Sequence, residues 1–243
     1  MKLTTAGESH GRALVGIIEG LPSNLKIDKS LIDADLALRQ GGYGRGGRQK
    51  IEHDKIEIIS GVRNELTLGS PLAFMIVNAD YKNWEGCMSA GPCDTSQRTL
   101  TRVRPGHADL SGMLKYGQKD ARNILERASA RETAVRVAAG AIAKQYLAAL
   151  GVKTAGYVKS VCGIEDGAEY TFEEVEGAKK HPLFMLDDRR EEEAMRFIDK
   201  LKADGDTAGG VVEVRISGLK SGFGSCMTYE QKLDGRLAGA IMG

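Results

Sequence analysis

The sequence lacks several features that mark common classes of protein. Its four cysteines form no CxxC pair, which argues against a zinc knuckle and against a disulfide framework. Cys87 and Cys93 flank a Gly-Pro loop, so a disulfide between them is an alternative to the favoured reduced thiols. No apolar run approaches the ~18 residues that span a membrane, and the N-terminus has no apolar h-region of a signal peptide. We therefore expect no membrane contact and a cytoplasmic location.

An excess of either charge is also missing. Lysine and arginine number 34 and aspartate and glutamate 33, so the net charge is +1. A protein with so little net charge has no bulk attraction to nucleic acid or to a membrane. Hydrophobic residues make up 42% of the 243 residues and charged residues 28%, ordinary values for a soluble globular protein. Any anion site must therefore come from basic residues gathered in one place.

What is present is a series of strand and helix patterns. Apolar runs predict strands at 13–18, 56–62, 72–78, 153–162 and 210–216. Helical spacing and capping residues predict helices at 28–39, 130–150, 190–203 and from about 228. These elements do not follow strict βαβ units. We therefore expect an α+β fold with antiparallel sheets in a single domain, residues 1–243.

Single residues mark the limits of these elements. Asp28 is expected to cap the first helix, and Ser129 with Glu132 to form a capping box at the start of the helix at 130–150. Gly151 fits the C′ position that ends that helix. Segment 79–107 has no clear periodicity, which is typical of a functional loop. The helical pattern at the end runs to Gly243 without a stop signal, which indicates a truncated chain.

His10 lies in a glycine-flanked motif, GESHG at 7–11, just before a predicted strand. An imidazole changes charge near neutral pH and suits general-acid work on a phosphate leaving group. The alternative is a surface histidine in a turn.

Three arginines, Arg39, Arg45 and Arg48, bracket the glycine-rich stretch QGGYGRGG at 40–47. Glycines let a backbone approach an anion, and a guanidinium matches phosphate or carboxylate oxygens. The alternatives are a flexible solvated loop and an RGG-like contact with RNA. The near-neutral charge and the limited aromatic interleaving, Tyr43 alone, count against RNA.

Arg104 opens a third motif, RPGHAD at 104–109. Asp109 either orients the imidazole of His107 or caps a helix running to Tyr116. In the alternative interpretation, Asp109 is only a helix cap and His107 is a satisfied surface residue.

Arg127 and Arg131 straddle the start of the helix at 130–150, where free N–H groups favour an anion. An ordinary capped helix with surface arginines is the alternative. His53 and His181 are expected at the surface, and no spacing of His, Cys and carboxylates predicts a metal site. Together the loop histidines and arginines predict a focused polyanion site with acid chemistry.

These motifs resemble the chorismate synthase family. The resemblance rests on five segments in the right order: GESHG at 7–11, RQGGYGRGGRQ at 39–49, RPGHAD at 104–109, ERASARETAVRVAAGAIAK at 126–144 and GDTAGGVVEV at 205–214. It implies an anti-1,4-elimination of phosphate from 5-enolpyruvylshikimate 3-phosphate, giving chorismate for aromatic amino-acid biosynthesis. It also implies a carbon-oxygen lyase that needs reduced FMN (FMNH2) without net redox change, and it associates NADP with the family.

The resemblance assigns roles to matching residues. His10 is expected to face the substrate phosphate, and His107 to lie by the flavin ring. The substrate's phosphate and carboxylates are expected to bind five arginines: Arg39, Arg45, Arg48, Arg104 and Arg131. The FMN contacts are expected from Arg127, Ala128 and Ser129.

The resemblance also implies an architecture and partners. The expected fold has helices sandwiched between two antiparallel sheets, assembled as a homotetramer. Because family members continue beyond the point where this sequence stops, the chain is expected to lack a C-terminal portion with further FMN contacts, and an inactive fragment is the alternative. We expect flavin reduced by an external flavin reductase or another reductant, and no nucleic-acid partner.

Overall fold

The computed structural model describes residues 1–46 and 51–243. Its largest sheet has four antiparallel strands in the order β1-β2-β7-β4. Their bounds, in that order, are Lys2–Ala6, Ala13–Glu19, Leu72–Val77 and Ile56–Ser60. Alternate residues are buried, such as Leu14 and Ile18 in β2 and Phe74 and Ile76 in β7, so one face of the sheet meets the core.

Two helices cover that face, α1 (Lys29–Gln40) and α5 (Thr133–Ala149). The buried side of α5 is mostly alanine, and these small side chains let the helix lie close to the sheet. As predicted, Asp28 caps α1, its carboxylate accepting from the backbone N–H of Ser30 at 2.8 Å. Gly151 occupies the C′ position of α5 with φ +78°, as the sequence indicated.

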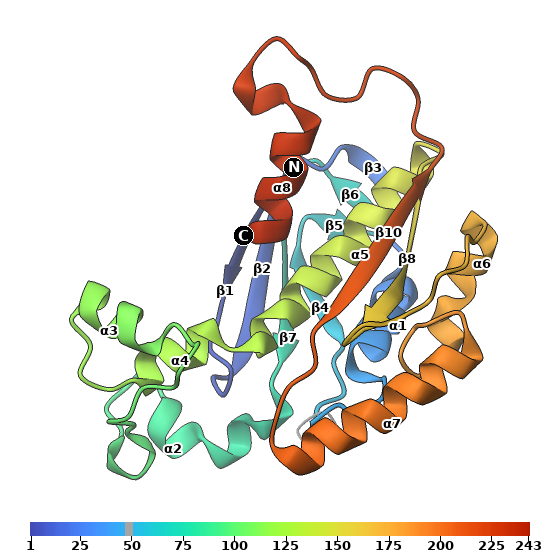
Figure 1. Ribbon diagram of the computed structural model, residues 1–243. Helices are drawn as coiled ribbons and strands as arrows, with labels where there is room; N and C mark the ends of the chain where they lie inside the picture. The colour runs from blue at the N-terminus through green and yellow to red at the C-terminus, as the bar shows by residue number, and fades with distance from the viewer. Residues whose placement is uncertain (47–50) are drawn as a thin grey trace.

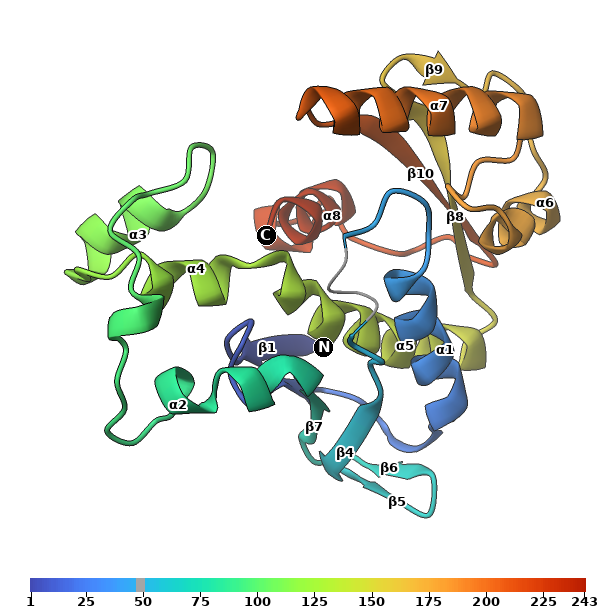
Figure 2. The same cartoon turned by 90° about the horizontal axis from the view of Figure 1, so that it is seen from below.

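A second antiparallel sheet has the order β10-β8-β9. Its strands are Gly210–Ser217, Lys153–Val161 and Ile164–Glu165. Helices α6 (Phe172–Gly177) and α7 (Asp188–Asp204) pack near it, and α5 contacts strands of both sheets. Helices therefore lie between two antiparallel sheets, and the predicted α+β class is confirmed (Figures 1 and 2).

The short helices α2, α3 and α4 lie together at one end of the molecule (Figure 1). Figure 1 shows α3 and α4 side by side, with α2 below them. The bounds are Glu85–Met88 for α2, Asp109–Tyr116 for α3, Arg122–Ala128 for α4 and Leu233–Met242 for α8. A small third sheet, β3-β6-β5, comprises Ser23–Lys26, Leu66–Leu68 and Val62–Arg63. The helices α3 and α4 place the segments that carry the RPGHAD and ERASAR motifs.

Two local predictions need correction. The strand predicted at 56–62 is interrupted, because the register against β7 shifts between Ile58 and Ser60 and the chain then turns into β5. The capping box at Ser129 and Glu132 is wrong. Ser129 accepts only from the N–H of Arg131, and the Glu132 carboxylate turns away to Thr5 and Arg136.

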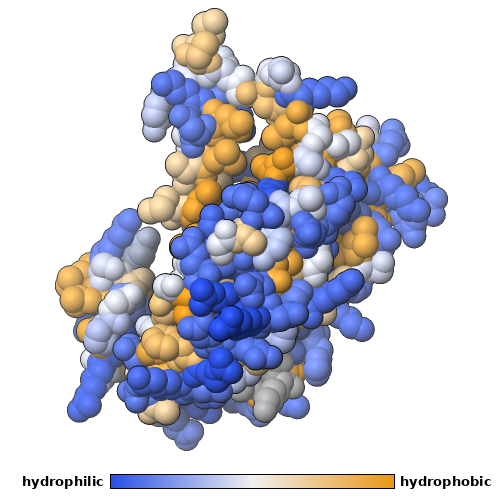
Figure 3. Space-filling model, turned by 45° about the vertical axis from the view of Figure 1, so that its right-hand side comes forward, coloured by the Kyte–Doolittle hydropathy of each residue, from blue (hydrophilic) through white to orange (hydrophobic). Residues whose placement is uncertain are grey.

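Apolar side chains also lie on the surface of α8 and β10. In Figure 3 they gather over the upper part of the molecule, where Figure 1 places α8. Val212, Val214 and Ile216 of β10 are 66%, 63% and 45% exposed, and Ile241 of α8 is 81% exposed.

Among the described residues no helix is both long and apolar enough to cross a membrane. All four cysteines are free thiols, so the alternative of a loop disulfide is not supported.

Two glycines give a paired test of this packing. A Cβ at the buried Gly16 would clash with the ring of Phe74 and lie 2.8 Å from Val135 Cγ1, so Gly16→Ala should lower the free energy of unfolding by about 1–3 kcal/mol. A Cβ at Gly140, inside α5, meets nothing within 4 Å, so Gly140→Ala should raise that energy by about 0.5–1 kcal/mol. Chemical denaturation measures both, and changes of the same sign would contradict this close approach of helix and sheet.

Candidate active site

The GESHG motif forms the turn between β1 and β2 and is fixed from three directions. Gly7 has φ +105°, and a Cβ there would lie 2.5 Å from the carbonyl oxygen of Ala13, so the turn requires glycine. The buried amide of Asn78 donates to the carbonyl of Gly11 at 2.7 Å. The N–H of Ser9 donates to the carbonyl of Glu126 at 2.9 Å. The turn that carries His10 is therefore attached to both β7 and α4.

The imidazole of His10 is held by a buried carboxylate. Its Nδ1 lies 2.9 Å from both oxygens of Glu126, and its backbone N–H donates to Glu126 Oε2 at 2.8 Å. Arg122 Nη1 also donates to Glu126, at 3.0 Å. Burial alone would raise the pKa of the Glu126 carboxyl, but the bonds from His10 and Arg122 hold that pKa below its ordinary value. Glu126 therefore carries a negative charge that fixes one edge of the His10 ring.

Trp84 covers the face of the same ring. The two ring centroids are 3.9 Å apart with an interplanar angle of 26°. The guanidinium carbons of Arg98 and Arg122 lie 4.2 and 5.0 Å from the Trp84 ring centroid. The indole N–H donates to Asp80 at 3.0 Å. Segment 79–107, which showed no periodicity, thus supplies one wall beside His10.

His107 is held at both ring nitrogens. Its Nδ1 lies 2.5 Å from Asp109 Oδ1, and its Nε2 lies 2.9 Å from Arg104 Nη2. Because a guanidinium only donates, Nε2 accepts and Nδ1–H donates to Asp109. Burial alone would raise the pKa of the Asp109 carboxyl, but bonds from Arg104 and His107 hold that pKa below its ordinary value. Of the two readings of Asp109, orientation of the imidazole is confirmed, since its side chain makes no helix cap.

Arg131 is committed to buried partners. Its guanidinium makes a bidentate pair with Asp54, at 2.6 and 2.7 Å, and its Nε donates to Asn78 at 2.9 Å. Glu52 lies 3.6 Å from Arg131 Nη2. Arg131, Asp54, Glu52 and Asn78 are all less than 10% exposed. The positive charge of Arg131 is therefore compensated within the protein.

The other arginines that were predicted to bind the substrate differ in their protein contacts and in their exposure to solvent. Arg39 donates to the Thr133 hydroxyl at 2.9 Å and to the carbonyl of Ala130 at 3.0 Å, and lies 3.7 Å from Asp54. Arg45 is exposed to solvent. Arg104 is half-exposed, and Arg48 lies outside the described residues. A cavity of about 220 Å³ gathers several of these groups: Arg39, Gln40, Gly46, Glu52, Ser129, Ala130 and Arg131.

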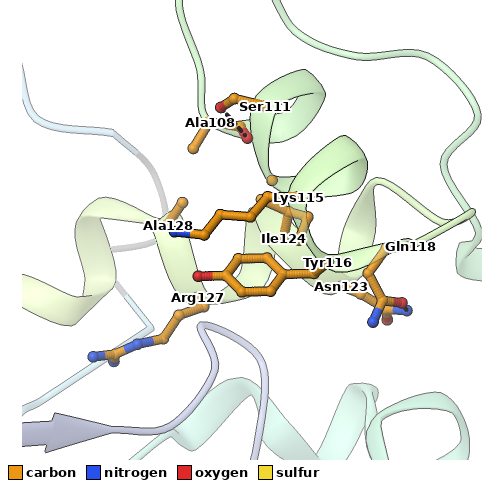
Figure 4. A pocket seen from close by; sticks show the side chains of 10 residues that line it. Ala108, Ser111, Lys115, Tyr116, Gln118, Asn123, Ile124, Arg127 and Ala128 are labelled. Carbon is orange, nitrogen blue, oxygen red and sulfur yellow. Dashed lines mark hydrogen bonds between the residues drawn. The ribbon is translucent and has the colours of Figure 1, made fainter.

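A larger cavity, of about 700 Å³, lies between α3 and α4 (Figure 4). Its wall includes two cationic side chains, Lys115 and Arg127, and the ring of Tyr116. Arg127 is anchored by Nη2 to the carbonyl and hydroxyl of Thr5, at 3.0 and 2.6 Å. Ala128 lines this cavity and the next residue, Ser129, lines the smaller one. The predicted cofactor stretch thus lies at the junction between two cavities.

The structure therefore places His10 and His107 in two groups of residues that are linked through α4. His10 joins α4 through Glu126, and His107 lies just before α3. Helix α3 packs closely against α4, where a Cβ on Gly112 would lie 2.5 Å from Ile124 Cγ2. Sequence reasoning assigned no role to several supporting groups: Glu52, Asp54, Asn78, Trp84 and Glu126. The signal for Glu126 was its place at the start of a matched motif. Asn78 is the last residue of the strand predicted at 72–78, and Glu52, Asp54 and Trp84 lie in segments for which no element was predicted.

The two remaining histidines lie elsewhere. His53 is exposed, as expected. His181 is only partly exposed, and its Nδ1 lies 3.3 Å from Glu191 and 3.4 Å from Asp188. The ligand atoms of these three side chains lie within 4.8 Å of one another, an approach that the sequence spacing did not indicate. The buried Glu191 also accepts from the N–H of Leu183 at 2.7 Å, which gives it a structural role.

The lowered pKa of Glu126 predicts an acid-dependent contribution to stability. A carboxyl with a folded pKa below its unfolded value stabilises above the unfolded pKa, about 4.3 for Glu, and loses this as pH falls through the folded pKa. The melting temperature of the wild type should therefore exceed that of Glu126→Gln at neutral pH, and this difference should narrow on acidification. The exposed Glu57→Gln serves as the control. A gap that stays constant across the pH range would contradict the assignment.

Known proteins are similar to this chain in sequence and in fold. A family model described as chorismate synthase matches residues 1–243. Chorismate synthase of Shouchella clausii is 49% identical over 250 residues, an alignment that covers 100% of this chain and 64% of that protein. Chorismate synthase of Thermus thermophilus is 50% identical over 239 residues, covering 98% and 62%.

A solved structure, titled "Crystal Structure of Chorismate Synthase", superposes with a TM-score of 0.79 at 37% identity. It covers 99% of this chain and 65% of that one. The chain thus spans about 64% of the length of the curated relatives it matches. None of these comparisons supports the alternative of an RNA-binding module. The match over the whole chain, together with the shared fold, gives the conclusion: the chain belongs to the chorismate synthase family.

Proposed function

We propose that the chain carries much of the active site of a chorismate synthase, which eliminates phosphate from 5-enolpyruvylshikimate 3-phosphate. The observation that carries this proposal is the state of His10. Its Nδ1 is held by Glu126, whereas its Nε2 has no hydrogen-bond partner among the described residues. An imidazole fixed in this way offers one ring nitrogen to a ligand, as a general acid must. His10 would protonate the phosphate as it leaves.

His107 has a complementary role in this proposal. Its Nε2 accepts from Arg104, so the nitrogen becomes available only when that guanidinium turns away. Arg104 is half-exposed and can reach an anionic ligand without unfolding its surroundings. Binding of an anion by Arg104 would then release His107 to hold or supply a proton beside the cofactor.

The arginines divide into two classes in the proposed substrate site. Arg45 and Arg104 are accessible and would bind phosphate or carboxylate oxygens directly, together with Arg48. Arg39 and Arg131 line the cavity of about 220 Å³, with Asp54 beside both. For these two the proposed contribution is a rigid cationic wall whose charge is already partly balanced.

The cavity of about 700 Å³ suits a flavin mononucleotide. Its size falls within the usual range for cofactor sites, and its wall offers two cations for a phosphate and an aromatic ring for a flat group. Lys115, Tyr116, Arg127 and Ala128 would hold it, with Ser129 at the junction to the smaller cavity. Held by these residues, reduced FMN would lend transient electron density as phosphate departs. The flavin would be reduced by a separate reductase or another reductant, since we propose a monofunctional lyase.

We propose a homotetramer of single-domain chains for the assembled protein. The apolar surface of β10 and α8 supports this, because exposed apolar patches on soluble proteins mark interaction surfaces. Val212, Val214 and Ile216 form a stripe along an edge strand of their sheet.

The two histidines are the direct test of the function. Anaerobic phosphate release from 5-enolpyruvylshikimate 3-phosphate with chemically reduced FMN should fall about 10²-fold or more in His10→Ala and in His107→Ala. The exposed His53→Ala is the matched control and should retain wild-type turnover. Chorismate synthase of Thermus thermophilus provides the positive control for the assay. Full activity in both active-site variants would reject the assigned roles.

The cofactor site has a separate test in binding. Arg127→Ala should weaken FMN binding about 10-fold, because it removes one of the two cations from the wall of the larger cavity. Quenching of flavin fluorescence measures the dissociation constant without turnover. Arg189→Ala, on α7, is the control for a general loss of positive charge. Equal FMN affinity in Arg127→Ala and wild type would place the cofactor elsewhere.

A further inference from the structure

Trp84 is the only tryptophan of the chain and does not belong to the hydrophobic core. It is only partly buried and lies in none of the hydrophobic clusters formed by the described residues. Its ring instead stacks on the ring of His10, with centroids 3.9 Å apart. A large aromatic side chain outside the core that contacts a proposed acid has a role other than filling space.

Its neighbours restrain Trp84 itself. The indole N–H donates to Asp80 Oδ2 at 3.0 Å, and Arg98 lies over the ring at 4.2 Å. Arg122 contacts both the Trp84 ring and the Glu126 carboxylate. The tryptophan is therefore fixed by residues from its own segment and from α4, and it can act as a rigid surface.

Two independent restraints then act on His10. Glu126 holds Nδ1 in the plane of the imidazole, and Trp84 blocks movement perpendicular to that plane. The turn backbone is tied to α4 through Ser9 and His10. Only Nε2 remains without a partner among the described residues.

We propose that Trp84 is a positioning residue that, together with Glu126, presents His10 Nε2 to the leaving phosphate. This inference rests on the proposed function for its role in turnover, but the stacking itself does not. Holding a reacting group in one orientation lowers the entropic part of the barrier, so loss of the stack should reduce turnover more than substrate binding. A second consequence is optical, because an imidazole in contact with an indole quenches its fluorescence.

The charges that face this pair are Glu126 on the edge of His10, Arg122 beside both rings, and Arg98 and Asp80 around Trp84. Because the chain has one tryptophan, its emission should report the contact with His10 directly.

The first experiment compares the Trp84 emission of the whole chain with that of two histidine variants at one fixed neutral pH. His10→Gln should raise the emission, because it removes the ring stacked on the indole. The exposed His53→Gln should leave the emission unchanged. Equal emission in His10→Gln and wild type would overturn the stacking.

The second experiment separates positioning from folding. Trp84→Leu should lower kcat for phosphate release about 10-fold with little change in KM, and Trp84→Phe should recover most of it by restoring a ring. Circular dichroism checks that both variants fold. Wild-type kcat in a folded Trp84→Leu would overturn the positioning role. If neither the wild type nor any variant releases phosphate while His10→Gln changes the Trp84 emission, the proposed function fails and the stack stands.

Discussion

The buried carboxylate of Glu126 connects parts of the chain that lie far apart in the sequence. It accepts from the backbone and ring of His10 in the β1–β2 turn and from Arg122 one helical turn away. A carboxylate out of water is costly unless such donors satisfy it, and their combined effect outweighs burial, since its pKa is lowered. The charge needed to hold His10 is thus maintained by the same contacts that close the turn.

The distribution of charge limits where an anion can be attracted. Asp54 accepts hydrogen bonds from Nη1 and Nη2 of Arg131 and also lies 3.7 Å from Arg39. The buried part of the site therefore carries little net charge. Removing one member would strand a charge in the interior, which makes this network rigid. In the proposed function, attraction of a polyanion then depends on the accessible guanidinium groups of Arg45 and Arg104, which can move to meet it.

Local patterns predicted the elements that are stabilised locally. The helix cap at Asp28 and the C′ glycine at 151 were correct because both depend on contacts within a few residues. The sequence indicated the position of the candidate site through His10 and His107, but not the groups that support them. Asn78, Trp84 and Glu126 act across 67 to 116 positions of the chain, or through a ring contact, and no periodicity records such pairs. The failed capping box shows the same limit, since Glu132 found a partner in a distant strand, at Thr5.

The two histidines are held in the same way at Nδ1 and differ in the partner of Nε2. Each has Nδ1 against a buried carboxylate, Glu126 for His10 and Asp109 for His107, which fixes ring orientation in both cases. At His10 the second nitrogen has no partner among the described residues, whereas at His107 it accepts from Arg104. The first histidine is therefore ready before a ligand arrives, and the second depends on a side chain that an anion can attract. In the proposed function, an anionic ligand would meet an acid already in place and, by engaging Arg104, make the second nitrogen available.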